Sequence, residues 1–159
     1  MARASSASKA RPSIGRLRDP AVPQTTYLDR VRKLQQAMKE LGFAALVLEP
    51  GPAMADLTGV RWGRSERTFA MIVTETGVPA WVLPAFEEKR ARELIRSGDL
   101  HLWQEDENPF AIIAQVLRDR GLQSGRLGLE DSVRFFVFDG LRRQAPRFEY
   151  ASAAAALNR

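Results

Sequence analysis

The 159-residue sequence contains no cysteine and a single histidine, His101. Without cysteine the chain cannot form a disulfide framework, a thiolate zinc site, an iron–sulfur cluster or a thiol nucleophile. One histidine excludes metal sites that need several imidazole ligands. No uninterrupted apolar run reaches the roughly 18 residues that a membrane-spanning helix needs. We therefore expect no membrane partner.

Common catalytic and phosphate-binding motifs are also missing. The sequence has neither a G-x-x-x-x-G-K-[ST] loop nor a strand-linked G-x-G-x-x-G loop. No G-x-S-x-G motif accompanies His101, which lies between Leu100 and Leu102 in a short predicted strand. Because no partner for His101 is visible in the sequence, we assign it a structural or surface role.

Positive charge is concentrated at the start of the chain. The net charge is +5, and residues 1–26 hold five basic side chains and one acidic side chain. Residues 27–159 hold 19 basic and 18 acidic side chains, so this part is nearly neutral. A segment rich in Ser, Ala, Pro and Arg buries too little apolar surface to offset its ordering entropy. We predict a disordered basic tail at 1–26 and no nucleic-acid partner.

A helical pattern begins at Thr26. Apolar residues at spacings of three and four predict one buried face, formed by Leu28, Val31, Leu34, Met38 and Leu41. Thr26 and Asp29 resemble a capping pair, and Gly42 is typical of the residue that follows a helix.

Strand and helix patterns alternate over the rest of the chain. The expected strands are 44–48, 69–74, 79–83, 100–103, 127–129 and 148–151. The short connection between 69–74 and 79–83 predicts a β-hairpin. A charged helix is expected at 85–97, with Phe86 among its apolar contact points.

Two further helices carry capping signals. Asn108 followed by proline predicts the start of one helix, and Asp131 or Ser132 is expected to cap another that ends at Arg143. The alternation of elements predicts a single α/β domain at residues 27–159, with a mixed sheet flanked by helices.

Glu49 and Glu130 each follow a predicted strand directly. Carboxylates at strand ends can converge on metal ions, as a two-metal nuclease would require. However, Glu49 precedes a Pro-Gly-Pro turn and Glu130 precedes a helix start, where an acidic residue is favourable for dipole reasons. A metal-dependent nuclease is the rival enzyme hypothesis.

One polar loop combines arginine with tryptophan. It contains the candidate interface or active-site-entrance residues Arg61, Trp62, Arg64, Glu66 and Arg67. Arginine offers forked donors for carboxylates, and tryptophan offers a large contact area. An ordinary solvated loop is the alternative.

The order of several short motifs resembles a known family. Besides the first helix and strand, the motifs are Leu57-Thr58-Gly59, Ser65-Glu66-Arg67, Pro84-Ala85-Phe86-Glu87-Glu88, Trp103-Gln104-Glu105 and Gly128-Leu129-Glu130. Together they resemble the N-terminal domain of the creatinase, prolidase and aminopeptidase P family over about residues 27–157. The resemblance implies a creatinase N-terminal, ribonuclease-H-like fold.

In that family a pita-bread domain follows and holds two metal ions through two aspartates, a histidine and two glutamates. None of these ligands corresponds to a residue of this sequence. The resemblance therefore implies a non-catalytic domain with no catalytic residue, metal ligand or cofactor of its own. Two divalent ions, such as manganese, are expected in the catalytic domain.

The resemblance also implies partners and a location. The expected partner is a pita-bread catalytic domain, in the same chain or a separate one, within a cytoplasmic homodimer. The expected roles are domain packing, dimerisation and shaping of the active-site entrance of an Xaa-Pro peptidase. A stand-alone protein-interaction module is the alternative.

Overall fold

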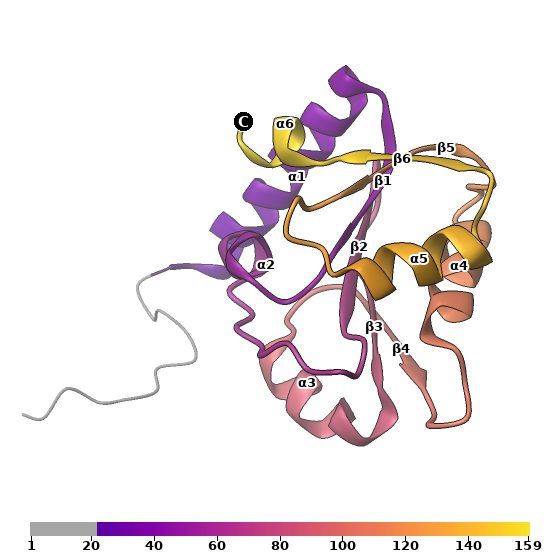
Figure 1. The fold of residues 1–159 in the computed structure, drawn as a ribbon. Coiled ribbons are helices and arrows are strands. Elements are labelled where there is room, and N and C mark those ends of the chain that lie inside the picture. The colour runs from indigo at the N-terminus through magenta and orange to yellow at the C-terminus, as the bar shows by residue number, and fades with distance from the viewer. Residues whose placement is uncertain (1–21) are drawn as a thin grey trace, which may run out of the picture.

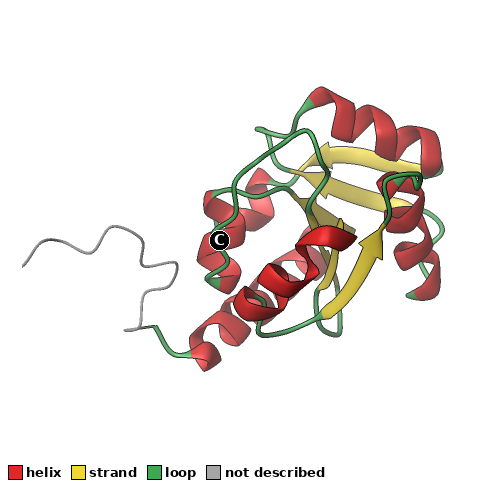
Figure 2. Ribbon diagram, turned by 90° about the horizontal axis from the view of Figure 1, so that it is seen from below, coloured by secondary structure: helices red, strands yellow, loops and turns green. Residues whose placement is uncertain are grey.

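A computed structural model describes residues 22–159 as a mixed sheet with helices on both faces (Figures 1 and 2). The strands are β1 Phe43–Leu48, β2 Ala70–Thr74, β3 Ala80–Pro84, β4 Asp99–Trp103, β5 Gly125–Leu129 and β6 Phe148–Ser152. The helices are α1 Gln24–Leu41, α2 Pro52–Thr58, α3 Glu88–Leu94, α4 Pro109–Asp119, α5 Phe135–Gln144 and α6 Ala154–Leu157. The predicted α/β fold is confirmed.

The six strands lie in the order β4-β3-β2-β1-β5-β6. β1 is parallel to β5, β5 is parallel to β6, and β3 is parallel to β4. β2 is antiparallel to both of its neighbours, so β2 and β3 form the expected hairpin. Because β2 alone runs in the opposite direction, the carboxyl ends of the other five strands meet at one edge of the sheet.

Apolar side chains fill both sides of this sheet. On one face α1, α2 and α6 pack against a core that contains Met38, Met54 and Trp81. On the other face α4 and α5 pack against a second core that contains Ile113, Leu117 and Val137. Between residues 22 and 159, no helix has both the length and the apolar character needed to cross a bilayer.

The first helix begins earlier than the capping pattern predicted. α1 starts at Gln24 after Pro23, so Thr26 lies inside its first turn and makes no cap. The backbone N–H of Thr26 instead donates to the Pro23 carbonyl at 3.0 Å. Gly42 ends α1 with a φ of 77°, as predicted. Most of the predicted basic tail, residues 1–21, lies outside the described residues.

The helix predicted after β3 needs correction. The segment predicted as one helix at 85–97 consists of a single 3₁₀ turn, Ala85–Glu87, followed by α3, which ends at Leu94. Ile95 leaves the helix because its backbone is extended. Phe86 on the 3₁₀ turn is exposed rather than buried.

The two predicted caps have different outcomes. The Asn108 side chain accepts a hydrogen bond from the Phe110 N–H at 2.9 Å, which confirms the cap of α4. Neither Asp131 nor Ser132 caps α5, because Arg134 occupies the N-cap position. The Arg134 N–H donates to the Glu49 carboxylate at 3.1 Å, so the start of α5 is held by a residue that follows β1 rather than by a local side-chain cap.

Candidate functional site

Charged and aromatic side chains gather at the carboxyl edge of the sheet. Glu49 follows β1, Glu105 follows β4, and Glu130 follows β5. The loop at 61–67 lies at the same edge because it precedes β2, the one strand that enters the sheet from that side. In parallel sheets this edge is where functional groups are commonly placed.

Glu49 is the buried centre of this edge, with a side chain that is only 2% exposed. Arg134 donates to Glu49 Oε1 from Nε at 3.0 Å and from Nη2 at 2.6 Å. Its backbone N–H reaches Oε2 at 3.1 Å. Charge-assisted hydrogen bonds of this kind are about twice as strong as those between neutral groups. Glu49 therefore ties the end of β1 to the start of α5.

Arg134 and Arg64 extend this anchor to the polar loop. The remaining terminal nitrogen of Arg134, Nη1, donates to the Ser65 carbonyl at 2.7 Å. Arg64 donates to the Pro50 carbonyl at 2.8 Å and to the Ser132 carbonyl at 2.9 Å, and lies 3.8 Å from Glu49. These contacts hold the loop against the ends of β1 and β5.

Glu130 lies beside the Glu49 carboxylate in a half-buried position. Its Oε1 is buried and accepts no hydrogen bond within residues 22–159. Burial raises the pKa of the Glu130 carboxyl, and the negative charge of Glu49 adds to this effect. Arg64 and the backbone of Glu49 act in the opposite direction, but burial dominates.

Trp62 packs against the body of the domain. Its ring stacks on Phe69 with centroids 4.4 Å apart, and the Arg90 guanidinium lies 4.2 Å from the centre of the Trp62 ring. Contacts of both kinds fix the orientation of an aromatic side chain. Trp62 is therefore a packed residue of the loop rather than a free contact group.

Arg67 also has partners within the domain. It forms an ion pair and hydrogen bond with Glu105 and lies 5.0 Å from the ring centre of Phe86. The hydrogen bond from Arg67 lowers the pKa of the Glu105 carboxyl. Glu66 is a weaker neighbour at 3.9 Å. Arg61 is exposed. Trp62 and Arg67 therefore pack within the domain, whereas Arg61 faces solvent.

The two carboxylates of the nuclease hypothesis are neighbours, but they are not arranged as metal ligands. Both oxygens of Glu49 accept hydrogen bonds from Arg134. In the part of the chain from residue 22 onward, no group of three or more His, Asp or Glu side chains could hold a metal ion. A carboxylate already neutralised by arginine is a poor ligand for a hard cation. His101 lies in β4, which β3 and β2 separate from β1.

Sequence reasoning missed the residues around the start of α5. Arg134 had no recognisable motif, because its partner Glu49 is 85 residues away. Two exposed aromatic side chains follow it, Phe135 at 72% and Phe136 at 40% exposure. Phe86, at 62%, is a third exposed aromatic residue at this edge. The only available signal was the Phe-Phe pair that follows an arginine.

Known proteins share this fold and part of the sequence. The "Probable dipeptidase PepE" of Mycobacterium tuberculosis is 32% identical over 97 residues, which is 57% of this chain and 25% of that protein. The dipeptidase PepE of Mycobacterium ulcerans superposes with a TM-score of 0.76 at 24% identity, over 86% of this chain and 37% of that one.

A solved domain of similar size also matches. The Creatine_N superfamily domain of a dipeptidase from Streptococcus thermophilus has a TM-score of 0.69 at 19% identity, over 81% of this chain and 96% of that one. By contrast, the chain spans about a third of the length of the longer relatives it matches. The family model described as Creatinase/Prolidase N-terminal domain matches residues 30–159. The chain belongs to the creatinase/prolidase N-terminal domain family.

Proposed function

We propose that this chain serves as the non-catalytic N-terminal domain of an Xaa-Pro dipeptidase or aminopeptidase. The observation that carries the proposal is the family match over residues 30–159, together with relatives named as dipeptidases that are about three times as long as the match. Peptide hydrolysis would then belong to a pita-bread catalytic domain, located in the same chain or in a separate one.

The metal chemistry is assigned to that catalytic domain. Two divalent ions, such as manganese, would activate water for attack on the peptide bond there. The carboxylates of this domain support this assignment. The buried Glu49 accepts hydrogen bonds from Arg134, and within residues 22–159 no three potential metal ligands converge. This domain would contribute binding and positioning rather than a reacting group.

We assign the carboxyl edge of the sheet as the surface that packs against the catalytic domain and supports a homodimer. Phe86, Phe135 and Phe136 expose apolar area there. Aromatic residues beside arginines are typical of interface centres, and exposed apolar area favours association. The Glu49–Arg134 anchor keeps this surface rigid, which reduces the entropy lost on docking.

The loop at 61–67 would shape the entrance of the active site. Arg61 is exposed, and Arg67 is held by Glu105 at the same edge. Guanidinium groups suit the C-terminal carboxylate of an arriving peptide because their pairing can be two-pronged. The Glu105 pairing of Arg67 also supports the alternative, in which Arg67 is an internal strut.

Hydrolysis of an Xaa-Pro dipeptide with manganese tests the assignment. The purified 159-residue chain should show no turnover, whereas the chain with the catalytic domain encoded downstream of Arg159 should be active. Turnover by the chain alone would contradict the proposal. A monodisperse monomer with no pita-bread domain encoded downstream would favour the interaction module instead. Cell fractionation tests the proposed cytoplasmic location.

A further inference from the structure

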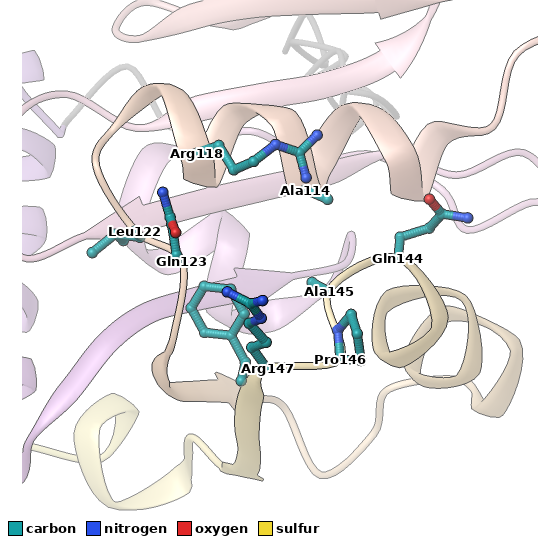
Figure 3. A pocket seen from close by; sticks show the side chains of 9 residues that line it. Ala114, Arg118, Leu122, Gln123, Gln144, Ala145, Pro146 and Arg147 are labelled. Carbon is teal, nitrogen blue, oxygen red and sulfur yellow. The ribbon is translucent and has the colours of Figure 1, made fainter.

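A cavity of about 270 Å³ lies at the sheet edge opposite the carboxyl edge. It is bounded by the C-terminal half of α4 and by the segment that joins α5 to β6 (Figure 3). Phe148 is the first residue of β6, and Gln123 lies just before β5, so the cavity is at the amino ends of these parallel strands. The proposed docking surface does not include it.

The floor of the cavity is apolar. Ala114 on α4, Ala145 after α5 and Phe148 on β6 all belong to the second core and are almost fully buried. Concave sites with an apolar floor and a few polar groups are the usual form of small-ligand sites. The volume, just below the usual range for such sites, suits a small ligand.

The polar groups around the floor are hydrogen-bond donors. Arg118 stands on the α4 side and Arg147 on the opposite side, with Gln123 at one end (Figure 3). No carboxylate lines the cavity. Within residues 22–159 the Arg147 guanidinium has no ion-pair or hydrogen-bond partner, whereas Arg118 uses Nη2 to reach Gln115 at 2.8 Å. Two arginines with spare donors therefore face the same space.

At the end of α4, backbone N–H groups already occupy the carbonyl groups nearest the cavity. The carbonyls of Val116, Leu117 and Arg118 accept hydrogen bonds from the N–H groups of Arg120, Gly121 and Leu122 at 2.9 to 3.2 Å. The Ala145 carbonyl accepts from the Tyr150 hydroxyl at 2.8 Å. A ligand would consequently meet side-chain donors rather than these oxygen lone pairs.

We propose that this cavity binds a small organic anion, composed of an oxyanion group and a short apolar group. The oxyanion, a phosphate or a carboxylate, would lie between Arg118 and Arg147, because guanidinium groups pair well with both. The apolar group would cover Ala145 and Phe148. This inference is independent of the peptidase assignment, because the two surfaces lie at opposite edges of the sheet.

Titration of the purified chain at constant ionic strength tests the proposal. The probes are phenyl phosphate, benzoate, inorganic phosphate and phenol, followed through the backbone amide signals of residues around the cavity. Phenyl phosphate or benzoate should bind saturably, and the tighter one identifies the oxyanion. Inorganic phosphate lacks the apolar group and phenol lacks the charge, so both should bind more weakly. Failure of both phenyl phosphate and benzoate to saturate, or equal binding of phenol, would overturn the proposal.

Substitutions distinguish specific binding in the cavity from a general attraction of anions to a positively charged protein. Arg147→Ala and Arg118→Ala should each weaken binding about tenfold, because each removes charge-assisted hydrogen bonds. Arg32→Ala is the matched control, since it removes the same charge from an exposed position on α1, on the other face of the sheet. Unchanged melting curves would show that all three variants fold. Equal weakening by Arg32→Ala would mean that only net charge matters and would refute the site.

Discussion

Arg134 Nη2 lies 2.6 Å from Glu49 Oε1, although the two residues are 85 positions apart in the chain. This contact joins the end of β1 to the start of α5. Through Ser65, Arg134 also holds the loop at 61–67. One buried ion pair thus connects the end of β1, the start of α5 and the loop at 61–67.

Replacing Glu49 should destabilise the domain strongly. Glu49→Ala removes the carboxylate that pairs with the Arg134 guanidinium and lies near that of Arg64. Both guanidinium groups are mostly buried, so they would lose their counter-charge in a poorly solvated position. Removing one partner of a buried ion pair costs about 3–5 kcal/mol. Urea unfolding measures the free energy of unfolding. Asp56→Ala, which breaks an exposed pair with Arg30, should cost less than about 1 kcal/mol. Similar values for the two variants would contradict the anchor role of Glu49.

Glu130 should make stability depend on pH. Its pKa in the folded chain is raised above the ordinary 4.5, so the folded state retains a proton that the unfolded state has lost. Stability from this group is therefore complete below the ordinary pKa and falls as pH rises through the raised pKa. Glu130→Gln cannot ionise, so its stability relative to the parent chain should increase with pH across this window. A difference that stays constant with pH would contradict this prediction.

Tyr150 should ionise at unusually high pH. Burial raises the pKa of its hydroxyl to about 12, and the hydroxyl donates to the Ala145 carbonyl at 2.8 Å. Ultraviolet titration should show a tyrosine that ionises near this value, and the signal should be absent in Tyr150→Phe. The same variant should lose about 1 kcal/mol of stability with the hydrogen bond. Ionisation of Tyr150 near pH 10 would refute the prediction.

Phe135 should matter for association rather than for folding. Its side chain is 72% exposed, so Phe135→Ala should change the free energy of unfolding by less than about 0.5 kcal/mol. The same change should weaken self-association, or binding to the catalytic domain, in sedimentation measurements. Val137→Ala is the contrasting control because Val137 is fully buried in α5 and should lose stability. Unaltered association would exclude Phe135 from the docking surface.

Arg67→Ala distinguishes the entrance role from the strut role. The Arg67–Glu105 pair is solvent-exposed, and such pairs contribute little to stability, so the melting temperature of the chain should be almost unchanged. In the complete enzyme the variant should raise KM or weaken the dimer. A melting temperature several degrees lower for the chain alone would identify Arg67 as an internal strut.

The sequence alone determined the type and order of most elements. The apolar spacing of α1, the buried runs of β1 to β3 and the Asn108 cap of α4 are local signals, because each depends on residues within one turn or one strand. The family resemblance followed from the same order of motifs and is confirmed by the match over residues 30–159.

Only the tertiary structure decided how the charged residues are used. In the sequence, Glu49 could be explained by a turn or a metal site, since nothing near it indicates Arg134. The start of α5 was misplaced for the same reason, because Arg134 at its N-cap is held by Glu49, which follows β1, and neither Asp131 nor Ser132 caps the helix. The cavity between Arg118 and Arg147 likewise exists only after α4 and α5 pack on one face of the sheet. Strand order and packing decide which distant residues pair, and short-range sequence patterns do not indicate these pairs.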